Sequence, residues 1–237
     1  MDFAKAITYV FEDRRWPTKI GIAAVIALVP ILNFSITGYA VEVIRRLMRR
    51  ESEALPEWDN LEQYFMDGLR LWVVGIVYSL PLLLLICLLL FPIIFKLLLG
   101  TSNEDMQNFL SGFGLLALVC GGLIMFFYSL FLSFLSPAIM SRYASYGSIS
   151  ACLRIGEIWQ MVAQDVGGYI TLWLGILALT LGGAIVFGVA AVVANILPCI
   201  GQVLAILIEV LSVTYLLCAS AHLIGQFAVK NVQVGQA

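Results

Sequence analysis

Two ionisable side chains in the last apolar segment, residues 203–229, are the ones best placed to do chemistry. Glu209 is a carboxylate among hydrocarbon side chains, and His222 is the single histidine of the chain. An acidic residue inside a membrane span costs about 2.5 to 3.5 kcal/mol on insertion scales, so its presence favours an ion or proton pathway. Histidine changes charge near neutral pH. Along one helix the two residues would lie about 20 Å apart, so they cannot form a direct acid–base pair.

Two asparagines beside proline turns are candidates to complete an intramembrane polar site around Glu209. Asn33 follows Pro30, and Asn195 precedes Pro198. Their amides could line a polar cavity together with the carboxylate. The alternative is that they satisfy backbone groups that the prolines leave without a partner. It is also open whether Glu209 only reaches interfacial water.

A basic cluster lies at the end of the first apolar segment. Its four arginines are spaced so that they share one side of a helix: Arg45, Arg46, Arg49 and Arg50. Such residues suit phosphate headgroups, each contributing ~1 kcal/mol near an anionic membrane surface. Alternatively, they pair with the acidic residues that follow and only mark the cytoplasmic side. Trp58 is a candidate anchor at the membrane interface, where tryptophan is enriched.

Composition identifies an integral membrane protein. Of 237 residues, 62% are hydrophobic and 12% are charged, against about 25% charged residues in a soluble domain. The mean hydropathy is +1.00. The basic residues cluster beside apolar segments, so we expect no nucleic-acid partner. No phosphate loop, nucleophile motif or metal-ligand spacing is present, and we predict neither enzyme activity nor a cofactor or metal site.

The pattern of apolar segments predicts an all-α polytopic membrane bundle forming one domain, residues 1–237. We expect five to six transmembrane or re-entrant helices from the apolar runs at residues 20–41, 71–99, 109–135, 169–197 and 203–229. Apolar stripes at helical spacing predict interfacial amphipathic helices over residues 3–11 and 149–162. Asp59 is predicted to cap the helix that leads into the second run. Pro137 is predicted to end the third run, and residues 101–108 to form a loop.

The first apolar run, residues 20–41, either crosses the membrane once or turns back at Pro30. A turn would place all of the 13 Lys and Arg residues except Lys96 on one side, as the positive-inside rule requires. We therefore predict a hairpin in a multi-pass cell-membrane protein, with both termini and the loop at residues 45–70 in the cytoplasm. The first arm would be re-entrant or would begin near Pro17, a residue suited to a first helical turn.

An internal repeat is predicted between residues 1–50 and 150–229. Each half has an interfacial helix followed by a hairpin that turns at a proline, Pro30 or Pro198. Glu42 and Glu209 occupy corresponding positions, each within a short apolar stretch.

Several short motifs carry a resemblance to a known family. They are Gly38-Tyr39-Ala40, Arg45-Arg46, Leu55-Pro56-Glu57-Trp58-Asp59, Asp67-Gly68-Leu69 with Tyr78 and Pro81, and Ala221-His222-Leu223-Ile224-Gly225-Gln226. This arrangement resembles the bacterial and archaeal membrane-protein family catalogued as domain of unknown function 4013. The resemblance implies a multi-spanning protein without assigned activity, substrate or catalytic residues.

Two functions follow as predictions. The first is a non-enzymatic membrane scaffold or accessory protein whose arginines bind lipid headgroups or a partner at the cytoplasmic face. The second is a transporter or channel component that uses the repeat, the broken helices and Glu209, as many secondary transporters do. The sequence does not predict a particular protein partner or an oligomeric state.

Overall fold

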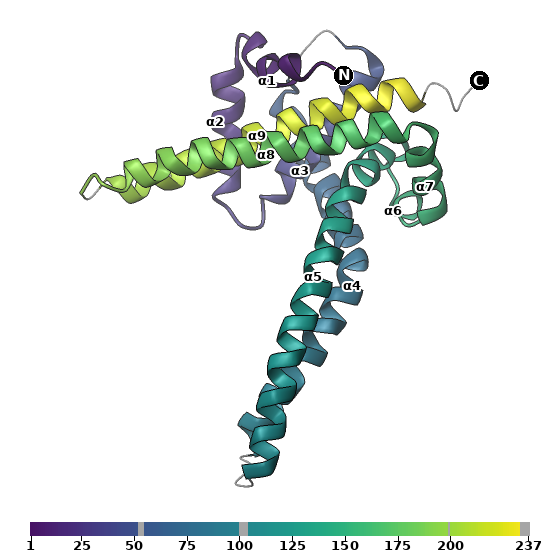
Figure 1. Ribbon diagram of the computed structural model, residues 1–237. Coiled ribbons are helices and arrows are strands. Elements are labelled where there is room, and N and C mark those ends of the chain that lie inside the picture. The colour runs from purple at the N-terminus through teal and green to yellow at the C-terminus, as the bar shows by residue number, and fades with distance from the viewer. Residues whose placement is uncertain (52–54, 100–103, 199, 233–237) are drawn as a thin grey trace. The chain divides into compact units, whose positions relative to one another are not determined.

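The computed structural model describes residues 1–51, 55–99, 104–198 and 200–232, and this part of the chain is helical without strands (Figure 1). The elements are α1 (Phe3–Glu12), α2 (Trp16–Ala27), α3 (Phe34–Arg49), a 3-10 turn η1 (Trp58–Asn60), α4 (Leu61–Leu99), α5 (Glu104–Tyr146), α6 (Ile149–Cys152), α7 (Ile155–Gln164), α8 (Val166–Ala194) and α9 (Gly201–Val232).

Within the described ranges, four helices are long and apolar enough to cross a membrane, namely α4, α5, α8 and α9. α2 is a shorter apolar helix of 12 residues. At a rise of 1.5 Å per residue it spans about 18 Å, little more than half the hydrocarbon core, which is the length of a re-entrant arm. The predicted all-α membrane class is confirmed.

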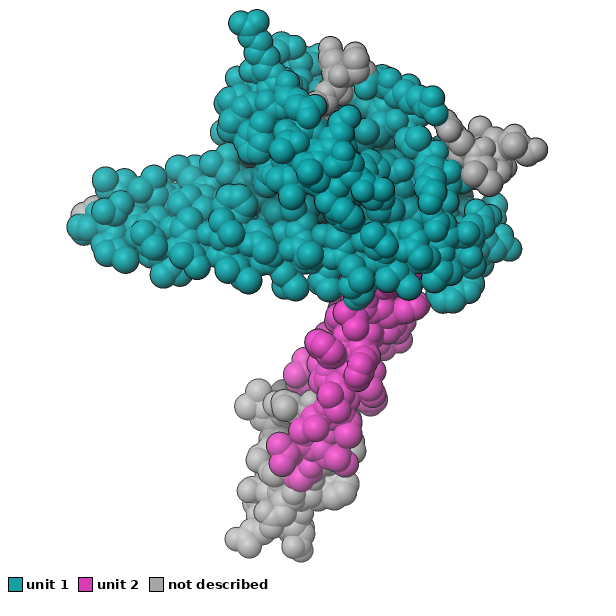
Figure 2. All heavy atoms as spheres, turned by 45° about the horizontal axis from the view of Figure 1, so that its top comes forward, with its two compact units in different colours: residues 1–73, 137–237 teal, residues 74–136 magenta. Residues whose placement is uncertain are grey.

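The chain divides into two compact units, residues 1–73 with 137–237 and residues 74–136 (Figure 2). The second unit consists of parts of α4 and α5. There the Tyr128 hydroxyl donates to the Tyr78 carbonyl at 2.7 Å, and the Leu89 side chain lies against Gly121. That the whole chain forms one domain stays a prediction.

α9 is the central helix of the first unit and packs against α8, α3, α2 and α1. Figure 1 shows α8 and α9 running side by side as a long hairpin. The C-terminal half of α9 supplies much of the core, through small and aliphatic residues from Cys218 to Ala228. Small side chains there let the neighbouring helices approach closely, as is usual in membrane bundles.

Two glycines allow α3 and α4 to touch backbone to backbone. A Cβ atom at Gly38 would overlap the carbonyl of Tyr64, and one at Gly68 would overlap the carbonyl of Phe34. Neither neighbour is a side chain that could rotate away. This close approach brings the end of α3, with its arginines, beside the start of α4.

The first apolar segment is broken, as the hairpin prediction requires. α2 begins at Trp16 with proline in its first turn, and α3 begins only at Phe34. Pro30 lies in the turn between them, where the backbone N–H of Asn33 donates to the Val29 carbonyl. The order helix, helix, proline turn, helix occurs twice, in α1 to α3 and in α7 to α9, and the first copy has the short arm.

The predicted end of the third apolar run at Pro137 is wrong, because α5 continues through it to Tyr146. A proline at this position cannot donate to the carbonyl of Ser133. The Ser136 hydroxyl donates to that carbonyl instead, at 3.1 Å. The expected loop at residues 101–108 lies partly outside the described residues, and α5 already begins at Glu104.

Two further element predictions are corrected. The stripe over residues 149–162 forms two helices, α6 and α7. In one continuous helix the Ala151 carbonyl would accept the backbone N–H four residues later. Here Arg142 Nε donates to that carbonyl instead, at 3.1 Å. Asp59 is not a cap, since it lies inside η1. Glu57, in extended conformation, precedes that turn. The helices predicted over residues 3–11 and 149–162 otherwise fall where expected.

Candidate functional site

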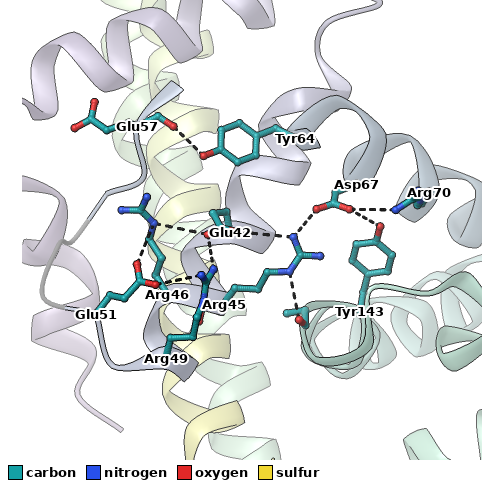
Figure 3. Close-up of polar contacts among 11 residues, drawn as sticks. Glu42, Arg45, Arg46, Arg49, Glu51, Glu57, Tyr64, Asp67, Arg70 and Tyr143 are labelled. Atoms are coloured by element: carbon teal, nitrogen blue, oxygen red, sulfur yellow. Dashed lines mark hydrogen bonds and ion pairs between the residues drawn. The ribbon is translucent and has the colours of Figure 1, made fainter. Parts of the chain in front are cut away.

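The polar site of the first unit is built around Asp67, on the first turns of α4. Arg45 from α3 donates to Asp67 Oδ2 at 2.5 Å, and the Tyr143 hydroxyl from α5 donates to Oδ1 at 2.7 Å. Arg70 lies one turn further along α4, with Nη1 at 3.7 Å from Oδ1. The Asp67 side chain is only 5% exposed and that of Arg45 16%. This carboxylate therefore holds three helices together at one point (Figure 3).

Glu42 forms a second centre one turn before Arg45 on α3. Arg49 donates to Glu42 Oε1 at 2.6 Å, Arg45 lies at 3.6 Å from Oε2, and Arg46 lies at 3.8 Å from Oε1. Glu51 closes the cluster, at 3.2 Å from Arg49 and 3.6 Å from Arg46. Figure 3 shows the arginines converging on Glu42. The prediction that these arginines pair with nearby carboxylates holds for Arg46 and Arg49 with Glu51.

A polar cavity of about 570 Å³ opens beside these two centres, and we call it the arginine cavity. Its charged lining consists of Arg45, Arg46, Arg49, Arg70, Glu42, Glu51 and Asp67. Four guanidinium groups thus face three carboxylates, which leaves one positive charge in excess. Arg49 is 55% exposed and Arg70 is 45% exposed, so these two present donors to solvent.

The other two residues predicted for lipid or partner binding have different surroundings. Arg50 is exposed and closes α3 in the left-handed conformation, with φ at 56°. Trp58 stacks on Tyr39 with ring centroids 4.4 Å apart, and its Nε1 donates to the Lys19 carbonyl at 2.9 Å. The indole of Trp58 thus packs between α2 and α3, half-buried.

Lys19 forms a buried ionic contact that sequence reasoning missed. Its ammonium lies at 2.7 Å from Asp13 and 2.9 Å from Glu57, and donates to the Leu55 carbonyl at 2.8 Å. Burial raises the pKa of Asp13, but the hydrogen bonds from the Lys19 ammonium and the Arg15 backbone N–H, together with the positive charges of both residues, outweigh it, so the net effect is a lowered pKa. The same ammonium, as the largest cause, lowers the pKa of Glu57. The segment after residue 54 is thereby fastened to α2.

The predicted intramembrane site is not assembled by contacts in the described part of the chain. Asn33, Asn195 and Glu209 are all exposed. The Asn195 side-chain amide donates to the Ala191 carbonyl at 3.0 Å, but that carbonyl already accepts the backbone N–H of Asn195, so it is not one that Pro198 leaves without a partner. No hydrogen bond or ion pair within the described residues engages the Glu209 carboxylate.

His222 is buried and belongs to the α1–α9 contact. Its ring stacks on Tyr9 at 4.3 Å between centroids, and its Nδ1 lies 3.1 Å from the Gln226 amide nitrogen. The Gln226 side chain in turn accepts a hydrogen bond from the Asp2 backbone N–H at 2.7 Å and donates one to the Asp2 carbonyl at 3.0 Å. The histidine thus helps to hold the start of α1 on α9.

The arrangement supports anion binding better than bond-making chemistry. Guanidinium groups bind phosphate and carboxylate through paired donors. In the part of the chain that the structure describes, no group of three His, Cys, Asp or Glu side chains is placed to hold a metal ion. Asp67, Arg70 and Tyr143 were missed as site residues because they come from other helices. The spacing of Glu42 before Arg45 and Arg49 was a local signal for part of the cluster.

Comparison with known proteins identifies a family without a described activity. No curated protein and no solved structure matches the chain. A family model described as "Protein of unknown function (DUF4013)" matches residues 21–199. The arginine cavity and the Leu55-Pro56-Glu57-Trp58-Asp59 motif lie inside this match, whereas residues 221–226 lie beyond it. Because the match covers well over half of the sequence, the chain belongs to the DUF4013 family of proteins of unknown function.

Proposed function

We propose that this protein is a non-enzymatic integral membrane protein that binds the phosphate of anionic lipid headgroups at the cytoplasmic face, through the arginine cavity. The observation that carries the proposal is the cavity of about 570 Å³ with four arginines in its wall. Such a volume lies within the ~300–1,000 Å³ of small-ligand sites.

The roles of the arginines differ according to their burial. Arg45 is held by Asp67 and fixes the wall of the cavity. Arg49 and Arg70 are about half exposed. The pair between Arg49 and Glu51 is also exposed on both sides, so it is weak. A phosphate can therefore take the place of Glu51 on Arg49 without breaking the buried contacts.

The expected membrane orientation supports this choice of ligand. The cytoplasmic leaflet carries anionic lipids, and basic segments next to a membrane span are attracted to it. The cavity lies where α3 ends and α4 begins, in the segment that the positive-inside rule assigns to the cytoplasm. A headgroup of the surrounding bilayer would reach the cavity at that level.

Binding of a soluble short-chain lipid tests the proposal. The full chain in detergent is titrated calorimetrically with dioctanoyl phosphatidylglycerol, and with dioctanoyl phosphatidylcholine as the zwitterionic control. Arg49→Ala and Arg70→Ala should each weaken phosphatidylglycerol binding about fivefold, the loss of one basic contact. Arg49→Lys should weaken it less than Arg49→Ala, because the charge remains while the paired donors are lost.

Arg14→Ala is the matched control, since Arg14 is exposed and has no ion pair within the described ranges. It should bind like the wild type. Equal affinity of the wild type for both lipids would refute the proposal, as would an Arg49→Ala/Arg70→Ala double variant with unchanged affinity.

Transport through a site at Glu209 stays a prediction. None of the described contacts joins Glu209 to Asn33 or Asn195, whereas the arginine cavity is assembled from three helices by specific contacts. We therefore propose headgroup binding in preference to transport.

A further inference from the structure

An apolar groove lies on the first unit, away from the arginine cavity, between α1 and α8. Its volume is about 690 Å³, and its lining includes Phe3 and Ile7 of α1, Leu174, Gly175 and Gly182 of α8, and Leu223 of α9. The groove shares no lining residue with the arginine cavity. Apart from the Thr171 hydroxyl, its side chains are hydrocarbon, so it suits an apolar chain.

A smaller polar pocket of about 310 Å³ continues the groove at one end. Phe3 and Thr171 line both spaces, so the two are contiguous. The pocket adds Gly168 at the start of α8, and Gln226 and Lys230 from the last turns of α9. Phe3 stands at the boundary, with its ring against Gly175.

Lys230 is the cation of this pocket, and its ion pair with Asp165 is exposed enough to be replaced. Its side chain is 68% exposed, and its ammonium lies 2.8 Å from Asp165 Oδ2. This hydrogen bond lowers the pKa of Asp165, helped by the Gly168 amide that donates to Oδ1. Exposed ion pairs of this kind contribute little net energy. An incoming phosphate can therefore share or replace the carboxylate on Lys230.

We infer that the groove and the pocket together bind one phospholipid, with an acyl chain along α8 and the phosphate at Lys230. A phospholipid has an apolar chain that ends at a charged phosphate. The site has the same arrangement, because an apolar groove of about 690 Å³ ends at the cation Lys230. α8 and α9 are also apolar enough to lie in a bilayer, which places the groove where acyl chains are present. A partner helix would fill the apolar channel but would leave the cationic pocket unused. The inference goes beyond the headgroup binding proposed above and uses other residues.

Photo-crosslinking tests the acyl-chain part. The full chain is reconstituted in palmitoyl-oleoyl phosphatidylcholine vesicles with a trace of phosphatidylglycerol that carries a diazirine in one acyl chain, and adducts are mapped by mass spectrometry. We expect adducts on residues 3–7 and 174–183. Gly182→Leu should reduce them about tenfold, a loss equivalent to 1.4 kcal/mol, because its side chain would occupy the groove.

Gly182→Leu has a matched control in Gly188→Leu. A Cβ atom at either glycine meets nothing within 4 Å, so the two positions admit the start of a side chain equally well. Gly188 is on the same helix but does not line the groove, and its substitution should leave the adducts unchanged. Equal labelling of the two variants, or adducts spread evenly around α8, would overturn the inference.

Lys230→Gln tests the headgroup part and should reduce labelling about fivefold, the contribution of one basic residue. Lys5→Gln is its control, an exposed lysine on α1 that does not line the pocket. Unchanged labelling in Lys230→Gln would contradict the placement of the phosphate. Cross-links between two copies of the chain at the groove would identify a helix as its occupant and also overturn the inference. Arg49→Ala should leave the groove adducts unchanged, so failure at one site is separable from failure at the other.

Discussion

Replacing Asp67 by asparagine removes the charge that two arginines and a tyrosine share. The change keeps the size of the side chain, so packing between α3, α4 and α5 is unaltered at first. Arg45 loses its ionic partner at 2.5 Å, and the Tyr143 hydroxyl loses a charged acceptor at 2.7 Å. Arg45 keeps the Ala144 carbonyl at 3.3 Å, Glu42 at 3.6 Å and the Tyr143 ring, whose centroid lies 5.8 Å from its guanidinium carbon.

The expected cost follows from burial. Removing one partner of a buried ion pair costs about 3 to 5 kcal/mol, because the other charge stays desolvated. Arg45 is 16% exposed and retains Glu42 nearby, so we expect a value near the lower end, about 3 kcal/mol. Tyr143→Phe removes one hydrogen bond to a charged group and should cost about 1.5 kcal/mol.

Equilibrium unfolding of the full chain in mixed micelles, with rising dodecyl sulfate and helix content followed by circular dichroism, measures these free energies. Asp59→Asn is the matched control, since Asp59 is exposed and makes no ion pair in the described ranges. It should change stability by less than about 0.5 kcal/mol. The double variant Arg45→Gln/Asp67→Asn should cost less than the sum of its single changes by at least about 1 kcal/mol. A cost for Asp67→Asn below about 1 kcal/mol, or strict additivity with Arg45→Gln, would refute this account of the cluster.

Two more predictions use the same unfolding measurement. Gly68→Ala should cost at least about 1 to 3 kcal/mol, because its Cβ would overlap the Phe34 carbonyl. Gly75→Ala, where a Cβ meets nothing, should be neutral or stabilising by up to about 1 kcal/mol, and equal stability of both variants would contradict the close α3–α4 contact. The pKa of Asp13 in the folded protein lies below its ordinary value of 3.8. The contribution of Asp13 to the free energy of unfolding is therefore fully present above pH 3.8 and is lost as the pH falls through the lowered pKa. Lys19→Met should flatten this acid-side loss, and an unchanged pH profile would show that Lys19 does not set that pKa.

The elements that sequence patterns predicted well are those determined by local signals. Apolar length marked α8 and α9, and proline with its neighbours marked the break between α2 and α3. Pro17 in the first turn of α2 was also foreseeable, since that position needs no backbone donor. Within the site, the spacing of Glu42, Arg45 and Arg49 on one helix face is local and could be recognised.

The remaining features depend on contacts between distant segments, which local spacing does not encode. Tyr143 reaches Asp67 from 76 residues away, and Trp58 stacks on Tyr39 rather than standing free. The helix containing Pro137 continues because a neighbouring hydroxyl takes the carbonyl that proline leaves unbonded. The first two contacts join segments far apart in the sequence, whereas the third is local but is made by a side chain that a count of backbone hydrogen bonds leaves out.

The two carboxylates at corresponding positions of the predicted repeat show how the halves differ. Glu42 is followed at helical spacing by Arg45, Arg46 and Arg49, and it is buried among them. The corresponding positions after Glu209 are Ser212, Val213 and Leu216, and Glu209 is exposed without a cation from the described residues. An uncompensated carboxylate within a membrane span costs about 2.5 to 3.5 kcal/mol. Glu42 is thus compensated by arginines of its own helix, whereas the corresponding turn after Glu209 offers no basic side chain.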